Sequence, residues 1–463
     1  MGTLFGTDGV RGKPGEGDLA PHRVRALARS AGRLLRTSPG LFSAAVPPAF
    51  ARLVDGRPDG GPLRDRVLLG RDTRASGPLV EEWLLEGFRE AGVGVVRAGV
   101  IPTPGVATLT RLWGCALGVV ISASHNPADD NGIKLISPQG FKIPDAAEEA
   151  VEAGLDSAGA APGAPAPEDR AARTGDYVDF LARFGRRLDG LTLVADCAHG
   201  AASAFAGRLL ERLGARAVVL HATPDGRNIN DGCGALHPER LAEAVRREKA
   251  HAGVAFDGDA DRAIFVDETG EIRDGDHVLA MAGLHLKEKR ALPGDTVVST
   301  VMANLGLERA LAKRGVSLAR TKVGDKFVAE EMLKSGAVLG GEQSGHVLFF
   351  DAAPAGDGML TMLRVLGLLA ERGEAFSKAA SVLVKYPQTL LNVKVARKPP
   401  LDQAPGVQSA IQAAQAELGE EGRLVVRYSG TENLCRVMVE GARKEAVDRT
   451  AQAVADAVKK ELG

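Results

Sequence analysis

The stretch that decides the fold reads Gly253-Val254-Ala255-Phe256-Asp257-Gly258-Asp259-Ala260-Asp261-Arg262-Ala263-Ile264-Phe265-Val266. Its two apolar ends are short and strand-like, so the sequence predicts two strands joined by an acidic loop. Three carboxylates on alternate residues repel one another and raise one another's pKa, so a cation is needed to keep them ionised. Oxygen ligands of this kind favour Mg²⁺, Mn²⁺ or Ca²⁺.

Two other interpretations of the acidic loop are open at this point. In an EF-hand loop that starts at Asp257, Glu268 would be the bidentate calcium ligand at position twelve. Against the EF-hand, Arg262 stands where the sharp turn requires Gly, and the flanks lack helical periodicity. The second alternative is a solvated hairpin turn without an ion. A metal site between two strands is the prediction that we carry forward.

Composition describes an ordinary globular chain. It has 463 residues, of which 44% are apolar and 25% charged, and this length indicates about three domains. The formal net charge is -1 and the basic residues are scattered, which argues against nucleic acid or a membrane surface as a partner. Any anionic partner is therefore expected to be small.

The four cysteines are far apart in sequence. They form no CxxC pair and have no His spacing suited to zinc, so we expect reduced, mostly buried thiols, at Cys115, Cys197, Cys233 and Cys435. The chain opens with Gly, Thr and Asp in place of a basic and then apolar stretch, and no run reaches transmembrane length. A cytoplasmic location is the expectation that follows.

Alternation of short apolar runs with helical patterns predicts an α/β protein with buried sheets. Strand-like runs, each followed by a polar loop and then a helical pattern, occupy residues 118–121, 191–194 and 296–298. Helical spacing predicts one helix over 21–35 and another over 199–213, which ends at Gly214.

Irregular stretches mark the expected boundaries. The Ala/Pro/Gly-rich residues 158–167 predict a linker after a first domain, and a further boundary is expected after the acidic loop and its second strand. Beyond Tyr386 and Pro387, residues 391–395 begin a smaller α+β unit. The proline-containing residues 38–65 predict a mobile surface insertion.

Ligands of open α/β sheets collect at the carboxyl ends of strands, so the loops there are candidate sites. Residues 122–127 read Ser-Ala-Ser-His-Asn-Pro and offer an exposed serine as a nucleophile, with a polar turn as the alternative. Lys134 follows as a cation, with an ordinary surface lysine as the alternative. The glycine-rich residues 5–12 with Arg11 suit a phosphate, although they lack the P-loop spacing.

Two later loops carry polar side chains suited to binding a ligand. Residues 340–346 (Gly-Gly-Glu-Gln-Ser-Gly-His) cluster hydrogen-bonding groups on a flexible backbone, which favours recognition of hydroxyls or an amine, although a tight turn is an alternative. Residues 427–436 combine hydroxyls, a glycine and two guanidiniums, which is typical of a phosphate cradle, with an ordinary strand end as the alternative.

Taken in order, these loops resemble the α-D-phosphohexomutase superfamily, most closely its bacterial members that act on glucosamine phosphate. The resemblance covers nearly the whole chain. Residues 122–127 resemble the phosphoserine loop, 257–262 the metal loop, 341–346 the sugar-specificity loop and 427–436 the phosphate loop. Residues 5–12, 321–325 and 437–441 also match the family pattern.

The resemblance implies four domains around a central cleft: three similar α/β domains and a smaller α+β C-terminal domain. On the boundaries found above, they correspond to residues 1–157, 168–272, 273–385 and 388–463. These domains would carry the phosphoserine loop, the metal loop, the sugar-specificity loop and the phosphate loop, in that order.

The implied activity is the interconversion of glucosamine 6-phosphate and glucosamine 1-phosphate through a phosphoserine and a sugar 1,6-bisphosphate. It would feed UDP-N-acetylglucosamine and cell-wall precursor synthesis. Action on glucose or mannose phosphate is the alternative, and a catalytically silent relative used for binding is another. The expected partner is a small hexosamine phosphate, the expected cofactor is one Mg²⁺ per chain with a sugar bisphosphate as activator, and the chain is expected to be a monomer or homodimer.

The resemblance assigns roles residue by residue. The catalytic set comprises Ser124, His125, Lys134, Arg262 and Arg11, with Lys134 favoured over His125 for moving the proton. The metal ligands are Ser124, through its phosphate, and Asp257, Asp259 and Asp261. The substrate-binding set comprises Glu342, Gln343, Ser344, His346, Arg427, Ser429, Gly430, Thr431 and Arg436.

Gln343 favours the aminosugar, because glucose and mannose mutases more often carry Met there. Three residues depart from the family pattern: Ala260 replaces the usual Gly of the metal loop, Asn433 replaces a Pro, and Lys326 stands where Arg is common. If residue 260 needs a positive φ, the Ala would disturb the metal geometry. Lys326 offers no bidentate phosphate contact, so its role in phosphate binding is in doubt.

Overall fold

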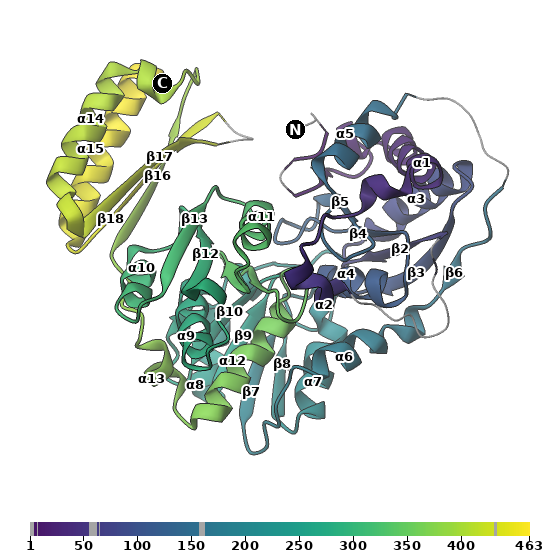
Figure 1. The fold of residues 1–463 in the computed structure, drawn as a ribbon, viewed down its shortest axis with the longest axis horizontal. Helices are drawn as coiled ribbons and strands as arrows, with labels where there is room; N and C mark the ends of the chain where they lie inside the picture. Colours follow the sequence, from purple (N-terminus) through teal and green to yellow (C-terminus); the bar gives the residue numbers. More distant parts are fainter. Residues whose placement is uncertain (1–3, 7, 55–62, 64, 157–162, 430–432) are drawn as a thin grey trace.

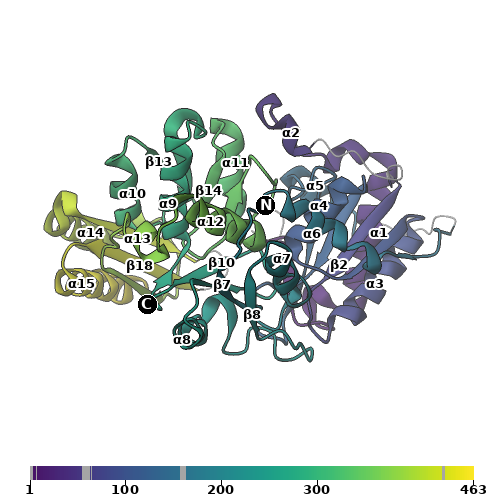
Figure 2. The same cartoon turned by 90° about the horizontal axis from the view of Figure 1, so that it is seen from below.

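The computed structural model describes residues 4–6, 8–54, 63, 65–156, 163–429 and 433–463. Its strands form four sheets, which define four units that follow one another in chain order along an arc (Figures 1 and 2). Within the described residues, no helix is long and apolar enough to cross a membrane.

The first sheet has the order β1-β5-β4-β2-β3-β6 and consists of β1 (Val10–Gly12), β5 (Asn131–Ile136), β4 (Leu117–Ile121), β2 (Arg66–Arg71), β3 (Gly94–Val100) and β6 (Glu168–Asp169). The second has the order β11-β10-β9-β7-β8 and consists of β11 (Ile272–Arg273), β10 (Ala263–Asp267), β9 (Ala252–Phe256), β7 (Thr192–Asp196) and β8 (Arg216–Leu220). The third has the order β13-β12-β14-β15, with β13 (Ser317–Thr321), β12 (Thr296–Thr300), β14 (Leu339–Gly341) and β15 (Val347–Phe349). The fourth has the order β16-β18-β17, with β16 (Gln388–Lys394), β18 (Leu434–Gly441) and β17 (Gly422–Tyr428).

The first three units repeat one arrangement of strands. A central strand (β2, β7 or β12) lies parallel to a neighbour on each side, and a last strand (β5, β10 or β15) runs antiparallel to the third. The loops β4–β5, β9–β10 and β14–β15 therefore occupy the same place in each unit. These three loops contain the predicted phosphoserine, metal and sugar residues.

Helices cover the sheets. Those of the first unit are α1 (Pro21–Thr37), α2 (Ala51–Val54), α3 (Gly77–Glu90), α4 (Thr103–Leu112) and α5 (Asp145–Ala153). The middle units have α6 (Gly175–Ala182), α7 (Ala206–Arg212), α8 (Glu239–Glu248), α9 (Gly275–Glu288), α10 (Leu305–Ala312), α11 (Asp325–Ser335), α12 (Gly358–Arg372) and α13 (Phe376–Ala380). In the fourth unit, α14 (Pro405–Leu418) and α15 (Lys444–Leu462) lie on the same side of the sheet (Figure 1).

The first three units share one apolar core, whereas the fourth has a separate one. One buried apolar cluster runs through the first three units, from Leu68 through Leu193 to Val297. The fourth unit has a core of its own, which includes Cys435, and it contacts the third through hydrogen bonds such as Asn304 Nδ2 to Glu440 Oε1 at 3.1 Å. The first three units thus form one continuous scaffold for their three equivalent loops.

Most predicted elements are present. The helix over 21–35 is α1, and the strands over 118–121, 191–194 and 296–298 are β4, β7 and β12. The helix over 199–213 is wrong as one element, because a 3₁₀ turn over Ala201–Ala204 precedes α7. The backbone N–H of Ala201 donates to Gly258 O at 2.8 Å, which holds this segment against the acidic loop.

Two further expectations need correction. The loop after β4 leads into β5 and not into a helix, because β5 pairs antiparallel with β4 and closes the sheet. The interpretation of residues 38–65 as a surface insertion is incomplete, because most of residues 38–53 lie at the surface while a few apolar side chains are buried. Phe50 and Leu53 are buried, and the Phe50 ring lies 5.5 Å from that of Phe350 in the third unit. Residues 55–62 and 64 lie outside the described residues, as do residues 158–162 of the predicted linker.

Candidate active site

The loops β4–β5 and β9–β10 meet at Ser124. Its Oγ donates a hydrogen bond to Asp257 Oδ2 at 2.6 Å. The backbones also approach closely, since a Cβ on Gly258 would lie 2.6 Å from the carbonyl oxygen of Ser124. The glycine of the acidic loop is therefore required for contact between two units.

Ser124 is buried, with 1% of its surface exposed, so the prediction of an exposed serine is wrong. The second unit covers the turn on which it lies, through Gly258 and Asn230. Its φ is +53°, a left-handed conformation that costs a residue with a Cβ about 1–2 kcal/mol. The Ser122 hydroxyl accepts from the Ser124 N–H at 2.9 Å and stabilises this conformation.

Arg74, which the sequence did not single out, organises the serine loop. Its fully buried guanidinium pairs with Asp72 at 2.9 Å. It also donates to the carbonyls of Ser124 at 3.0 Å, Asn126 at 2.9 Å and Asp130 at 3.0 Å, and it contacts Pro127 O. The signal that could have found it is the polar run that directly follows strand β2.

Arg74→Lys is expected to lower kcat at least about 10²-fold with little change in KM, because a small displacement of a reacting group has an effect of that size. A lysine cannot donate to several carbonyls in one plane, so the Ser124 turn loses its support. Turnover is measured well below the melting temperature. Arg320→Lys is the control, since Arg320 is half-buried and donates to Ala303 O at 2.9 Å in the third unit. An equal fall in kcat in both variants would contradict a positioning role for Arg74.

Asp257, Asp259 and Asp261 form a buried carboxylate cluster. One oxygen from each lies within 4.8 Å of the others, which fits three ligands of one cation. Among the described residues, no group donates to the buried Oδ1 of Asp259. Burial, Asp261 and Asp259 raise the pKa of Asp257 well above its ordinary value. A hard divalent cation would satisfy both observations.

The EF-hand alternative does not fit. The acidic loop joins strands β9 and β10, and Glu268 points elsewhere, since its Oε2 accepts from the Ser377 N–H at 3.1 Å. Ala260 has φ +57°, the condition that we expected to disturb the site, yet the three carboxylates converge.

Lys134 is a buried cation beside this cluster. Its Nζ lies 3.1 Å from Asp259, 3.1 Å from Asp8 and 3.6 Å from Asp261. Burial acts to lower the pKa of Lys134, but these carboxylates outweigh it and raise the pKa well above its ordinary value. Lys134 therefore keeps its proton. Asp8 lies within the predicted stretch 5–12 but was not singled out there. Thr103, whose Oγ1 donates to Asp259 Oδ2 at 2.7 Å, was not predicted.

His125 is better placed to accept a proton. Its Nδ1 lies 3.3 Å from Ser124 Oγ, and burial together with Arg262 and Arg11 lowers its pKa to about 4. The imidazole is consequently neutral near pH 7. Arg11 donates to Ala123 O at 3.3 Å, and Arg262 Nε lies 4.0 Å from both Asp257 and Asp261.

A cavity of about 560 Å³ lies beside Arg11, His125 and Arg262, and the β14–β15 loop forms one of its walls. Glu342 Oε1 accepts from Gly324 N at 3.1 Å. His346 lies 3.7 Å from Asp261 and 3.6 Å from Asp325. Burial acts to lower the pKa of His346, but these carboxylates outweigh it and raise the pKa to about 9. Gln343 is half-buried and Ser344 is exposed. The residues lining the cavity come from the first and second units and from the third.

The predicted phosphate loop lies on the fourth unit. Arg427 and Arg436 stand directly opposite each other on β17 and β18. Like charges in such a pair destabilise a sheet, so the arrangement favours an anion between them. The nearby Lys398 donates to Ser429 O at 3.0 Å. Gly430 and Thr431 lie outside the described residues.

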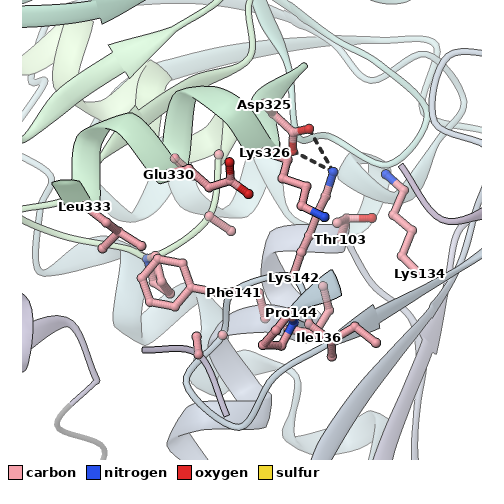
Figure 3. A pocket seen from close by; sticks show the side chains of 18 of the residues that line it. Thr103, Lys134, Ile136, Phe141, Lys142, Pro144, Asp325, Lys326, Glu330 and Leu333 are labelled. Carbon is pink, nitrogen blue, oxygen red and sulfur yellow. Dashed lines mark hydrogen bonds and ion pairs between the residues drawn. The ribbon is translucent and has the colours of Figure 1, made fainter. Parts of the chain in front are cut away.

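A second cavity of about 370 Å³ lies between the first and third units, next to the first cavity (Figure 3). Lys142 crosses it to Asp325 at 2.8 Å. Lys326, where we doubted a phosphate contact, pairs instead with Asp145 and lies 3.8 Å from Glu148. This lysine thus connects two units.

Comparison with known proteins agrees with this architecture. Four family models match in order: the phosphoglucomutase/phosphomannomutase alpha/beta/alpha domains I (residues 41–161), II (175–270) and III (274–386), and the C-terminal domain (390–457). The chain belongs to the phosphoglucomutase/phosphomannomutase family. The predicted superfamily and fold class are confirmed, and the chain is an enzyme of an isomerase family.

Individual relatives cover the full length. A phosphoglucosamine mutase of Symbiobacterium thermophilum is 45% identical over 100% of both chains, and one of Anaeromyxobacter sp. is 43% identical over 99% of this chain and 96% of its own. Among solved structures, a phosphoglucomutase/phosphomannomutase family protein of Burkholderia thailandensis has a TM-score of 0.79 and 26% identity over 99% of this chain and 97% of that one. The N-acetylphosphoglucosamine mutase of Aspergillus fumigatus, solved with GlcNAc-6P and magnesium, has a TM-score of 0.64 at 20% identity over 99% and 96%, which shows the shared fold.

Proposed function

We propose that this family member is a phosphoglucosamine mutase that interconverts glucosamine 6-phosphate and glucosamine 1-phosphate. Full-length relatives at 42–45% identity carry that name. The observation that carries the chemistry is the 2.6 Å hydrogen bond between Ser124 Oγ and Asp257, where two equivalent loops meet. The exact domain boundaries, the cytoplasmic location and the monomeric or dimeric state remain predictions.

Ser124 is proposed to carry the transferred phosphoryl group. The bond from Oγ to phosphorus breaks, a bond from a sugar hydroxyl oxygen to the same phosphorus forms, and a sugar 1,6-bisphosphate results. After the sugar has turned over, its other phosphoryl group returns to Ser124. Phosphoryl transfer depends mainly on positioning and on neutralising charge, which matches a strained, buried serine held by Arg74.

The cation is proposed to be Mg²⁺, held by Asp257, Asp259, Asp261 and a phosphate oxygen on Ser124. When bound, it neutralises charge on the transferred oxygens. Lys134 and Arg262 add positive charge at the same place. The triad is buried, and its oxygen-only donor set suits a hard ion.

Proton transfer is proposed to involve His125 in place of Lys134. The attacking sugar hydroxyl must lose a proton and the leaving Ser124 Oγ must gain one. The neutral imidazole of His125, whose Nδ1 lies 3.3 Å from Ser124 Oγ, can accept the proton and return it to that oxygen, whereas Lys134 is already charged. Lys134 then serves as a fixed cation. This reverses the preference stated from the family pattern.

The remaining contacts are proposed to hold the sugar in both orientations. Arg427, Arg436 and the loop between them would bind the phosphate that does not react, which the opposed guanidiniums favour. Glu342, Gln343, Ser344 and His346 would contact the sugar. Contacts at both ends of the substrate allow the sugar phosphate to bind in either orientation within one cavity.

The test of sugar specificity compares turnover of glucosamine, glucose and mannose phosphates. The wild type should show its highest kcat/KM with glucosamine phosphate, and Gln343→Met should lower the preference over glucose phosphate about 10-fold, because one lost polar contact has at least that effect. Gln415→Met, on the exposed face of α14, should leave it unchanged. A wild type that turns over glucose 1-phosphate faster would refute the aminosugar assignment.

A further inference from the structure

A second group of side chains of the kinds that bind metal ions lies in the second unit, apart from the three aspartates. Asp196 ends β7, His221 follows β8, and Cys233 precedes a 3₁₀ turn over Gly234–Leu236. One donor atom from each lies within 4.8 Å of the others. Their sequence spacing gave no sign of a metal site, because the sheet alone brings them together.

The geometry of the imidazoles points to a ligand. His221 Nδ1 lies 2.9 Å from Asp196 Oδ2, yet this contact lacks hydrogen-bond geometry. In the described part of the chain, the buried Nδ1 atoms of His199 and His221 have no hydrogen-bond partner. The two rings are 5.3 Å apart, so a second imidazole adjoins the group. Buried polar atoms without partners are rare and call for an explanation.

A polar turn held by Asp196 is the plain alternative, and it accounts for part of the group. Asp196 Oδ1 accepts from Ala198 N at 2.9 Å, and Oδ2 accepts from Gly234 N at 3.1 Å. A carboxylate has about four lone-pair directions, so two are left. These hydrogen bonds leave the imidazole of His221 unexplained.

We propose that Asp196, His221 and Cys233 bind one divalent transition-metal ion of the Zn²⁺ class. A mixed oxygen, nitrogen and sulfur donor set suits zinc or cobalt and disfavours Mg²⁺. Tetrahedral zinc ligands lie about 3.3–3.5 Å apart. His221 Nδ1 and Asp196 Oδ2 are 2.9 Å apart and all three donor atoms lie within 4.8 Å of one another, so binding requires side-chain shifts of about 1.5 Å or less. Three protein ligands leave a fourth position for water or for His199. Cys233 coordinates as the thiolate, so binding releases one proton from its sulfur.

Such an ion would stabilise the segments that support the Ser124 turn, without contacting the reacting atoms. The metal-binding segments are joined by a hydrogen bond from His199 N to His221 O at 2.6 Å, and Ala198 O accepts from Asn230 N at 2.9 Å. Asn230 Nδ2 in turn donates to Ser124 O at 2.9 Å. The proposal does not depend on the assigned sugar or on the reaction.

The test is Co²⁺ titration of the full chain in excess Mg²⁺, followed by absorption. The wild type should bind one Co²⁺ with a thiolate-to-cobalt charge-transfer band, which Zn²⁺ removes by displacement. The three aspartates offer oxygen only, so Co²⁺ there gives no such band. Cys233→Ser should abolish the band, whereas Cys115→Ser, which changes an equally buried thiol of the first unit, should retain it.

His221→Asn provides a second variant, since Asn tolerates the φ of +46° found there. It should weaken Co²⁺ binding at least about 10-fold and reduce the rise in melting temperature that Zn²⁺ produces. Absence of the band in the wild type, or its survival in Cys233→Ser, overturns the proposal.

Discussion

Ser124→Ala is expected to lower mutase turnover at least about 10³-fold and to remove phosphate incorporation altogether, because no other group replaces an absent nucleophile. The hydroxyl oxygen is the atom that would carry the phosphoryl group, and Asp257 lies 2.6 Å from it. Turnover of glucosamine phosphate and the intact mass of the protein, before and after incubation with a sugar bisphosphate, measure the two effects.

The fold should survive this substitution. The variant loses one hydrogen bond to a protonated carboxyl group, a contribution of about 0.5–1.5 kcal/mol, while the carbonyl of residue 124 keeps its bonds from Arg74 and Asn230. Ser137→Ala is a matched control, because Ser137 is a buried serine of the same unit whose Oγ accepts from Phe141 N at 3.2 Å. The control should take up phosphate and turn over normally. Phosphate uptake by the Ser124→Ala chain would eliminate the phosphoserine assignment.

The acidic triad was predictable because its information is local. Asp257, Asp259 and Asp261 alternate within one loop, and the flanking runs predicted β9 and β10. The pairing of distant loops came from the family resemblance. The repeated strand arrangement of the first three units gives the physical reason for that pairing, since each functional loop joins the third strand to the antiparallel fourth.

Other features depend on contacts between units and carry no local signal. Ser124 is buried because the second unit covers its turn, and Lys326 pairs with Asp145 because α11 faces the first unit. Phe42, Phe50 and Leu53 are buried within a stretch whose prolines suggested a loose insertion. Their apolar side chains were the signal that a proline-based interpretation overlooked.

Asp257→Asn is expected to leave the metal-free protein at least as stable as the metal-free wild type. Its turnover should nevertheless fall at least about 10³-fold, because the variant loses a metal ligand at the point of phosphoryl transfer. The stability part follows from the pKa. Burial and the neighbouring carboxylates Asp261 and Asp259 raise the pKa of Asp257 well above its ordinary value. A folded-state pKa above the unfolded value means that the folded chain holds a proton which the unfolded chain releases, so this group destabilises the fold as pH rises above about 4.

An amide at this position carries no charge; its oxygen can accept from Arg262 N, which lies 3.2 Å from Asp257 Oδ1, and its nitrogen can donate to the Ser124 hydroxyl oxygen, which lies beside Oδ2. Thermal melts with and without Mg²⁺ separate the two effects. Wild-type protein should gain about 2.7 kcal/mol when Mg²⁺ reaches a hundred times its Kd, and Asp257→Asn should lose most of that gain. Asp267→Asn, which changes a buried aspartate at the end of β10 that pairs with Arg273 at 2.6 Å, should lower stability and keep the response to Mg²⁺. If Asp257→Asn keeps the full Mg²⁺ response, the three aspartates are not the magnesium site.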